Sequence, residues 1–280
     1  MKISFAKMEG LGNDFVVIEN LAGKIKPAPP EVRFLCDRHF GIGADGVLLV
    51  EDSRAADLKM RIFNADGTEA ETCGNGIRCF ALYAFQRGLV SREDFQVETG
   101  AGVVDVKLKG GQAQVDLGRP LLEASAVPVN LPGRVINRGV TVGGAREAIT
   151  CLSLGNPHCV IFLPRDREIN LDDLGGKISH DPLFPNRTNV EFVRVVSPRE
   201  IEVKVWERGV GPTLACGTGA AAAAVAGVLN RKTFRRQLVH LPGGDLRVEW
   251  SRSGRVLITG PANLVFFGQI ELPIQETGSG

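Results

Sequence analysis

The sequence predicts an α+β fold made of two related, strand-rich halves, each with one dominant helix. Three observations support this prediction: short β-type segments fill most of the chain, only two long helical segments interrupt them, and the sequence repeats itself at a fixed offset. The length of 280 residues agrees with two domains of about 150 residues each.

The predicted strands are rich in β-branched and aromatic residues, and many alternate apolar with polar positions. They are ISFAKM (3–8), FVVIE (15–19), GVLLVED (46–52), LKMRIFN (58–64), FQVET (95–99), VVDVKL (103–108), AQVDL (113–117), CVIFL (159–163), VEFVRVV (190–196), EIEVKVW (200–206), DLRVEW (245–250), RVLITG (255–260) and LVFFGQIEL (264–272). One long helix begins near Gly74 and runs through IRCFALYAFQRG, and the other begins near Gly217 and runs through AAAAAVAGVLNRK. A shorter helix is predicted at 30–40, PEVRFLCDRHF.

The internal repeat is the most informative feature of the chain. An offset of 143 residues aligns LGNDFVVI (11–18) with LGNPHCVI (154–161), and FNADGTEAETCGNG (63–76) with WERGVGPTLACGTG (206–219). One gap-free offset that serves such distant blocks is not explained by reuse of glycine-rich turns. We therefore expect two copies of one domain, 1–118 and 119–262, related by a pseudo-two-fold axis, with 263–274 returning to the first copy as a strand.

Composition and charge exclude several classes of protein. Hydrophobic residues make up 44% and charged residues 23% of the chain, which is typical of a globular protein. The net charge of +1 provides no field for nucleic acid or an anionic membrane. The sequence starts without a signal-peptide pattern and its longest apolar run, 219–229, is too short to cross a bilayer. We therefore expect a cytoplasmic protein that binds neither nucleic acid nor membrane and keeps its cysteines reduced.

Each repeat places a cysteine directly before Gly-x-Gly and an apolar helix: Cys73 in the first copy and Cys216 in the second. The first N–H groups of a helix lack partners within it and carry the positive end of its dipole, so a thiolate there is stabilised and the thiol pKa is expected to fall. A lone cysteine of this kind is more often a small buried hydrophobe. Two at equivalent positions of a duplicated domain favour a functional pair.

Two opposed acid–base groups are what a racemase or epimerase needs. One thiolate removes the Cα proton and the other thiol delivers a proton to the opposite face, while the helix starts stabilise the developing charge without a cofactor. Pseudo-symmetry is expected to bring both thiols to one cleft between the domains. The other four cysteines, Cys36, Cys79, Cys151 and Cys159, are predicted to lie in the core.

Two further patterns do not indicate a cofactor or metal. GIGADG (41–46) fits the dinucleotide-binding glycine pattern, but a helix precedes it and a strand follows, which is the reverse of the required order. The Cys and His residues at 36–39 and 158–159 lack the partner pairs of a zinc site. We expect no cofactor and no metal.

At this point the motifs resemble a known family. NADGTEAETCGNGIRC (64–79) resembles the signature of the diaminopimelate epimerases, and GLGNDF, GNPHCV, RTNVEF, WERG and ACGTGA occur in the family's order along the whole chain. The resemblance implies a pyridoxal-independent, metal-free isomerase that interconverts LL- and meso-2,6-diaminopimelate for lysine and peptidoglycan synthesis. It also implies two barrel-like domains, each around a central helix, and a homodimer.

The resemblance also implies roles for individual residues. Cys73 and Cys216 form the acid–base pair, and His158 and Glu207 line the reaction centre. The reacting carboxylate is bound through helix N–H groups of Gly74, Asn75, Gly217 and Thr218, and polar ends of the substrate are held by Asn13, Asn64, Asn156, Asn189 and Arg208. Taken alone, the asparagines are also common turn residues, Glu207 and Arg208 suit a solvated pair, and His158 suits a loop cap.

Two positions depart from the family pattern. Gly46 stands where some members have a glutamine that contacts substrate, and its repeat counterpart is Asn189. Pro212 replaces an acidic or amide residue, and we expect it to stiffen the loop before Cys216.

Two alternative functions remain open from the residues. One is another two-cysteine racemase, such as a proline or hydroxyproline racemase, although Arg208 and the asparagines favour a substrate with a distal zwitterionic end. The other is a dithiol redox or binding protein that uses Cys73 and Cys216 as a switch. The redox function requires a reversible disulfide, which would inactivate an epimerase.

Overall fold

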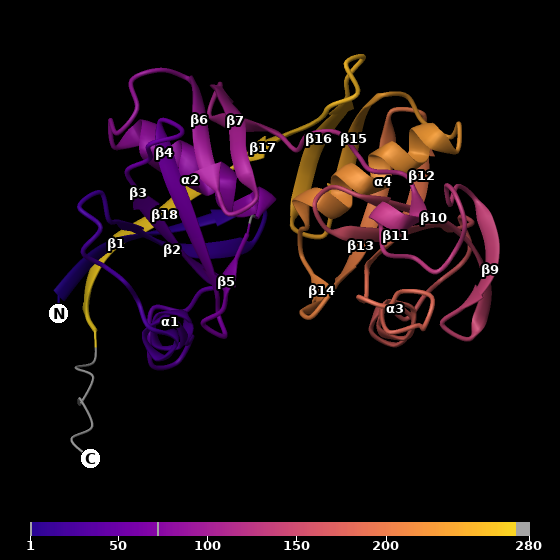
Figure 1. Cartoon of the computed structure of the whole chain (residues 1–280), viewed down its shortest axis with the longest axis horizontal. Coiled ribbons are helices and arrows are strands. Elements are labelled where there is room, and N and C mark those ends of the chain that lie inside the picture. Colours follow the sequence, from indigo (N-terminus) through magenta and orange to yellow (C-terminus); the bar gives the residue numbers. More distant parts are fainter. Residues whose placement is uncertain (1, 72, 273–280) are drawn as a thin grey trace. The chain divides into compact units, whose positions relative to one another are not determined.

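The computed structural model describes residues 2–71 and 73–272, and these form two compact units. The first unit contains the described residues up to Ala113 together with those from Pro261 onward, and the second is Gln114–Gly260 (Figure 1). Each unit is strand-rich with a buried helix among its strands, so the predicted fold class is confirmed.

The first unit has the strands β1 (Lys2–Gly10), β2 (Asn13–Glu19), β3 (Gly46–Glu51), β4 (Leu58–Asn64), β5 (Glu69–Ala70), β6 (Asp94–Thr99), β7 (Gly102–Lys109) and β18 (Asn263–Glu271), and the helices α1 (Pro29–Cys36) and α2 (Gly74–Gln86). The strands pair in the order β18–β1–β2–β3–β4–β6–β7, with β5 also on β4. The pairs β2–β3 and β4–β6 are parallel and the others antiparallel. Strand β8 (Gln112–Asp116) lies where the two units join along the chain.

The second unit has the strands β9 (Arg138–Val142), β10 (Ala145–Ser153), β11 (Pro157–Phe162), β12 (Asn189–Ser197), β13 (Glu200–Glu207), β14 (Gly211–Thr213), β15 (Arg236–Leu241), β16 (Gly244–Trp250) and β17 (Val256–Pro261). Its helices are α3 (Leu171–Ser179), α4 (Gly217–Leu229) and the 3₁₀ turn η1 (Ala124–Ala126). The strands pair in the order β9–β10–β11–β12–β13–β15–β16–β17, with β14 also on β13. As in the first unit, two pairs are parallel, β11–β12 and β13–β15.

The two units repeat the same pairing order at the offset of 143 residues that the sequence shows. Helices α2 and α4 differ by this offset at both ends, as do β1 and β10. The pairing register repeats too: Phe15 lies opposite Gly46, and His158 lies opposite Asn189. None of these elements therefore contains an insertion relative to its counterpart, and residues 143 apart can be compared directly.

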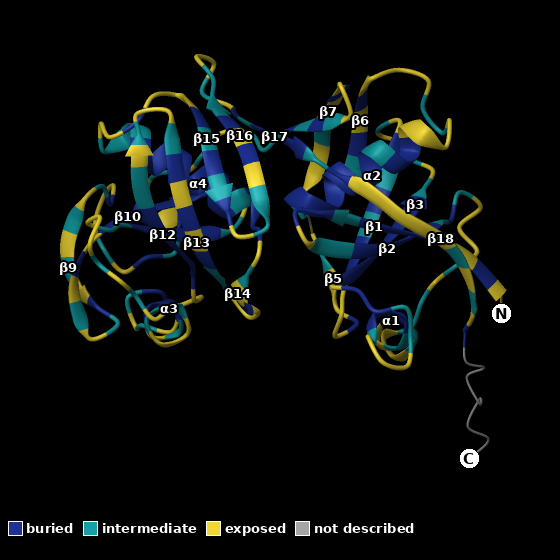
Figure 2. Ribbon diagram, turned by 180° about the vertical axis from the view of Figure 1, so that it is seen from behind, coloured by how far each residue is buried: buried dark blue, intermediate teal, exposed yellow. Residues whose placement is uncertain are grey.

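Local chemistry explains why the two central helices are buried. In α4 the run Ala220–Ala224 is buried on every side, because small side chains let a helix approach the strands closely (Figure 2). In α2 the buried positions include the larger Ile77, Phe80 and Tyr83. Both helices begin at a cysteine N-cap, which is the feature that positions the site.

Several elements differ from the predictions. The helix expected at 30–40 ends at Cys36, because the Asp37 carboxylate accepts the N–H groups of His39 and Phe40 at 2.7 and 2.8 Å and so turns the chain. The prediction missed helix α3, whose N-cap Asn170 accepts the Asp173 N–H at 3.3 Å. It also missed β5, β9, β10, β14 and β15. The repeat already indicated α3, because α1 shifted by the offset falls on it.

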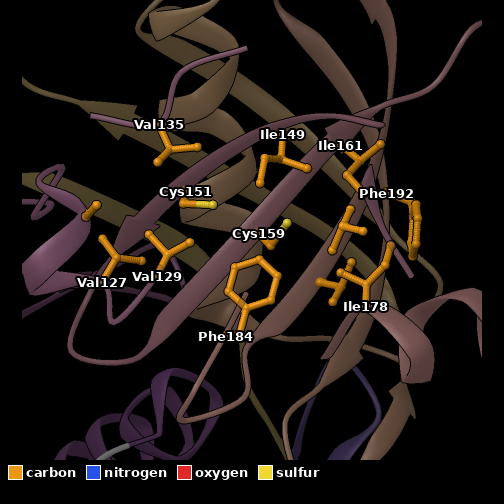
Figure 3. Packing of buried hydrophobic residues seen from close by; sticks show 13 residues of the cluster. Val127, Val129, Val135, Ile149, Cys151, Cys159, Ile161, Ile178, Phe184 and Phe192 are labelled. Carbon is orange, nitrogen blue, oxygen red and sulfur yellow. The ribbon is translucent and has the colours of Figure 1, made fainter. Parts of the chain in front are cut away.

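The four cysteines predicted to be structural are buried, which confirms the prediction. Cys151 and Cys159 pack among Val127, Val129 and Phe184 in the core of the second unit (Figure 3). In the first unit Cys36 and Cys79 are buried, and burial raises the pKa of Cys36 to about 12.

The segment after the second unit returns to the first. Strand β18 pairs antiparallel with β1, from Lys2 opposite Glu271 to Glu9 opposite Asn263. Residues 273 and 274 of the segment expected to return lie outside the described residues. In the part of the chain that the structure describes, every helix is too short or too polar to cross a membrane.

A partly buried charge cluster anchors the loop after α1 to the first strands. Lys7 lies 2.7 Å from Asp14, and Arg38 donates to the same carboxylate at 2.8 Å and also reaches Asp45. Burial alone would raise the pKa of Asp14, but the hydrogen bonds from Arg38 and Lys7 outweigh it and hold the pKa well below its usual range. The cluster therefore stabilises the fold while Asp14 is ionised.

We expect Asp14→Asn to lower the free energy of unfolding by about 2–4 kcal/mol at neutral pH, because Lys7 then lies buried without its counter-ion. Since the folded-state pKa is depressed, this contribution is present above the unfolded pKa of about 4 and is lost as the pH falls below it. Urea unfolding at pH 7 and pH 3 measures both effects. The exposed Lys107–Asp94 pair gives the control, Asp94→Asn, which should change little. Equal losses in the two variants would contradict the prediction.

Candidate active site

In the first unit the candidate site is built at the start of α2. Cys73 is the N-cap residue in extended conformation, and its Sγ accepts the Gly76 N–H at 3.4 Å. The thiol is partly exposed, whereas Gly74 and Asn75, which follow it, are buried. The structure thus places three predicted site residues together at one helix start.

A buried guanidinium lies on the same helix. Arg78 is 0% exposed, and it donates from Nη1 to the Gly74 carbonyl at 3.3 Å and from Nε to the Pro261 carbonyl at 3.2 Å. Its Nη2 has no hydrogen-bond partner among the described residues. Burial lowers the pKa of Arg78, and the nearby thiols Cys79 and Cys73 act in the opposite direction. A cation is therefore held in the core beside Cys73.

The remaining predicted residues of the first unit lie on loops and strand ends. Asn13 begins β2, and its Oδ1 is buried without a partner among the described residues. Asn64 is exposed at the end of β4 and donates to Thr68 Oγ1 at 3.0 Å, as a turn asparagine does. Gly46 is packed so tightly that an added Cβ would lie 2.6 Å from the Phe63 carbonyl oxygen. The backbone at position 46 therefore has no room for a glutamine.

In the second unit the equivalent site lies at the start of α4. Cys216 is the N-cap residue, and its Sγ accepts the Gly219 N–H at 3.3 Å and lies 3.5 Å from Thr218 Oγ1. The expectation of a lowered pKa is wrong for this thiol. Burial raises the pKa of Cys216 well above its usual range, the Glu207 charge adds to this, and the bonds from Thr218 and Gly219 only partly offset them.

His158 is not a loop cap but a fully buried residue of β11. Its Nδ1 lies 2.7 Å from Glu191 Oε1, and its Nε2 lies 2.9 Å from Asn156 Oδ1. His158 and Glu191 are both 0% exposed. Burial raises the pKa of Glu191, although His158 offsets part of the effect.

The third group of predicted residues surrounds the end of β13. Asn189 is buried, accepts the Arg208 N–H on Oδ1 at 2.8 Å and donates to the Pro157 carbonyl at 3.0 Å. Glu207 accepts the Thr213 hydroxyl at 2.6 Å. The Arg208 guanidinium is exposed and contacts the Asn186 carbonyl at 3.2 Å. Asn189 thus holds the backbone at Arg208 in place.

Pro212 does not lie in a loop as expected. It forms part of the short strand β14, opposite Trp206 of β13, where its missing N–H is tolerated at an exposed position.

Two site residues were missed from the sequence, Arg78 and Glu191. Both were visible as breaks in the repeat: the offset places Arg78 opposite Ala221, and Glu191 opposite Leu48. A charged residue in one copy where the other has an apolar one, on a buried face, is the signal that could have found them. Among the described residues no group of three or more His, Cys, Asp or Glu side chains is placed to hold a metal ion.

Comparison with solved structures defines the class of fold. The chain is similar to a PhzF-family phenazine biosynthesis protein from Bacillus anthracis, with a TM-score of 0.69, 16% identity and coverage of 97% of this chain and 99% of that chain. It is also similar to a probable proline racemase from Agrobacterium radiobacter K84, with a TM-score of 0.71, 14% identity and coverage of 98% and 94%. At these identities the similarity shows the fold alone, a two-unit, strand-rich fold that the chain shares with both proteins.

Sequence comparison then gives the family. The chain matches the diaminopimelate epimerase family over residues 5–122 and 150–265. It is also 50% identical over 275 residues to a diaminopimelate epimerase of Desulfitobacterium hafniense, covering 95% of this chain and 97% of the relative. The chain belongs to the diaminopimelate epimerase family and is an isomerase, as the sequence predicted.

Proposed function

We propose that the protein interconverts LL- and meso-2,6-diaminopimelate through a thiolate at one of Cys73 and Cys216 and a thiol at the other, without a cofactor. The observation that carries the proposal is the recurrence of one arrangement in both units. Each central helix begins at a cysteine N-cap whose Sγ accepts the N–H three residues further on. Membership of the family supports the same substrate.

The helix starts suit the chemistry of a carbanion-like transition state. We assign the N–H groups of Gly74, Asn75, Gly217 and Thr218 to the carboxylate next to the reacting carbon, where the positive ends of the two helix dipoles favour the charge that develops. One thiolate takes the Cα proton and becomes a thiol, while the other thiol gives its proton to the opposite face and becomes a thiolate. The two cysteines exchange states in each turnover, so reverse reaction uses the same groups.

Burial of Cys216 supports its assignment as the thiol in the resting enzyme. Its raised pKa keeps the proton on sulfur, and Glu207 acts in the same direction. Cys73 lies beside the buried guanidinium of Arg78, which favours the thiolate there. We assign His158 to the reaction centre with Glu207.

The distal end of the substrate needs groups for an amine and a second carboxylate. We assign these to Asn13, Asn64, Asn156, Asn189 and Arg208. Arg208 is exposed and can bind a carboxylate with two N–H groups, and Asn189 fixes its backbone at 2.8 Å.

The experiment is proton exchange in D2O with purified, reduced protein. We expect deuterium to enter Cα of LL-diaminopimelate as the meso form appears, with no turnover of L-proline or trans-4-hydroxy-L-proline. Turnover of proline alone would overturn the substrate, and reversible disulfide formation without any exchange would favour the dithiol function.

We further propose that the enzyme is a homodimer that uses β18. Four consecutive residues of this strand, Leu264, Val265, Phe266 and Phe267, are 36–57% exposed (Figure 2). A run of exposed apolar side chains on a strand is typical of an association surface. A groove next to it is lined in part by Phe5, Tyr83 and Phe267 of β18.

Phe267→Asp is therefore expected to convert the dimer to a monomer, because it places a charge in the apolar contact. Sedimentation velocity at micromolar concentration measures the change, and Phe40→Asp, an exposed phenylalanine elsewhere in the unit, is the control. A monomeric wild type would contradict the prediction.

We place the enzyme in the cytoplasm, where thiols stay reduced, and in the synthesis of lysine and peptidoglycan precursors. Both assignments follow from the proposed reaction, which requires Cys73 and Cys216 to carry protons rather than a disulfide.

A further inference from the structure

Behind Cys216 the second unit holds a continuous hydrogen-bonded chain that ends on a buried carboxylate. Glu191 Oε1 lies 2.7 Å from His158 Nδ1, and His158 Nε2 lies 2.9 Å from Asn156 Oδ1. Asn156 Nδ2 donates to Thr218 Oγ1 at 3.2 Å, and this oxygen lies 3.5 Å from Cys216 Sγ. Four contacts therefore join Glu191 to the thiol.

The donors in this chain fix its direction. Asn156 Oδ1 can only accept, so His158 Nε2 carries a hydrogen. Another hydrogen must lie between His158 Nδ1 and Glu191, since a carboxylate and a bare ring nitrogen cannot bond to each other without one. Because Asn156 donates to Thr218, the Thr218 hydroxyl hydrogen is available to Cys216 Sγ. In this direction the hydrogen-bonded chain favours a thiolate at Cys216 and so offsets part of the rise in pKa that burial causes.

Loss of the proton shared by Glu191 and His158 reverses the direction of the hydrogen bonds along this chain. His158 then keeps one hydrogen, on Nδ1 toward Glu191, and its Nε2 becomes an acceptor. Asn156 must turn its amide over to donate to Nε2, so its oxygen faces Thr218 and accepts the hydroxyl hydrogen. Thr218 is left with a lone pair toward Cys216, which suits a thiol S–H. One proton on the buried pair thus decides which state of Cys216 the chain favours.

The other unit shows that the fold does not require the buried pair. The repeat offset places Phe15 at the position of His158 and Leu48 at the position of Glu191, and both are buried. Leu48 also occupies the equivalent space: an added Cβ on Gly76 would lie 3.3 Å from Leu48 Cδ2, and one on Gly219 would lie 3.0 Å from Glu191 Oε1. Since burying polar groups is costly and an apolar pair packs in the same fold, the pair calls for a functional reason.

We propose that Glu191 is a positioning residue of the active site: it shares a proton with His158 and so sets the direction of the chain through Asn156 and Thr218 to Cys216. The inference rests on the proposed function, because that function gives Cys216 its acid–base role. The hydrogen-bonded chain has two directions. One suits Cys216 as a thiol and the other suits it as a thiolate, and Cys216 alternates between these two states in its acid–base role.

The test measures ionisation of Cys216 in the resting enzyme. Protein labelled with [3-13C]cysteine gives a Cβ signal for Cys216, assigned from the Cys216→Ala spectrum, whose shift reports thiol or thiolate across the pH range. We expect Glu191→Leu to lower the thiolate-to-thiol ratio at a fixed pH by about three- to tenfold, because Asn156 is no longer held in one orientation. Glu191→Gln should restore the ratio, since its amide N–H donates to His158 Nδ1.

The link through Thr218 is tested by a double-mutant cycle. Thr218→Val keeps the backbone N–H but removes the hydroxyl, so it should lower the ratio by at least as much as Glu191→Leu. The thiolate-to-thiol ratio of the double variant Glu191→Leu/Thr218→Val should be no lower than that of Thr218→Val alone. If Glu191 acted only through its charge, Glu191→Leu would instead raise the ratio, because the Glu191 and Glu207 charges both raise the pKa of Cys216.

Two controls separate this role from folding. Glu147 is a buried carboxylate paired with Arg167 at 2.8 Å, and Glu147→Gln should leave the Cys216 ratio unchanged. The double variant His158→Phe/Glu191→Leu carries the apolar pair of the first unit, so it should fold and should match Thr218→Val. A rise or no change in Glu191→Leu, or additive effects in the cycle, would overturn the proposal. Because no substrate is present, these results are independent of whether the protein turns over diaminopimelate.

Discussion

Alanine in place of Cys73 or Cys216 is expected to reduce turnover of diaminopimelate by at least about 10²–10⁴-fold, because each variant loses one of the two proton carriers. Both variants keep the helix: the N-cap contact they lose is a single bond from Gly76 or Gly219, at 3.4 or 3.3 Å. Deuterium entry at Cα in D2O measures how far proton transfer is lost at each face of this carbon.

The matched control is Cys151→Ala, which removes a buried thiol of the core. It should lower stability and leave kcat unchanged, since Cys151 packs among apolar residues (Figure 3). Full activity in either Cys73→Ala or Cys216→Ala would remove that thiol from the mechanism. Loss of activity together with loss of the fold would be recognised from the circular dichroism of the same samples.

The second large effect is expected at Arg78, where stability and activity should change in opposite directions. The guanidinium is fully buried, contacts only two carbonyls at 3.2 and 3.3 Å, and has no carboxylate partner among the described residues. An apolar side chain of similar length removes this desolvation cost, so Arg78→Met should keep or raise the melting temperature. The Cys73 thiolate loses its neighbouring cation, and kcat should fall by about 10–100-fold.

Arg78→Lys is the control, because it retains the positive charge but loses the planar guanidinium group. It should recover much of the kcat that Arg78→Met loses. A pH profile adds a readout that packing alone would not move: the ascending limb of kcat/KM should shift to higher pH in Arg78→Met, since the thiolate forms less readily. An unchanged profile would contradict a role for Arg78 in the ionisation of Cys73.

The sequence was most predictive where a pattern repeated. The positions of Cys73 and Cys216 at helix starts, and the two long helices, followed from the repeat and from glycines before apolar runs. The ionisation of Cys216 did not follow, because the helix start is local whereas the burial that raises its pKa comes from strands distant in sequence. Periodicity also missed β10 and β15, which contain polar and charged residues among the buried ones.

Where the copies differ, the structure was needed to see why. Arg78 stands opposite Ala221, and Glu191 opposite Leu48, so each of these two charges is buried in one unit where the other unit has an apolar residue. The signs are opposite, a cation in the unit of Cys73 and an anion in the unit of Cys216. Sequence similarity between the copies identifies the shared scaffold, and these buried differences identify what each half does separately.

The pairing of β18 with β1 sets the order in which the chain can fold as it is made. All strands of the second unit are contiguous in sequence, whereas the first unit takes its edge strand from residues 263–271, which are synthesised after the second unit. The second unit can therefore close while the chain is still growing, and the first, although it emerges earlier, must wait with one side of β1 uncovered. The unit whose first strands precede the other unit in sequence is therefore the unit that finishes folding last.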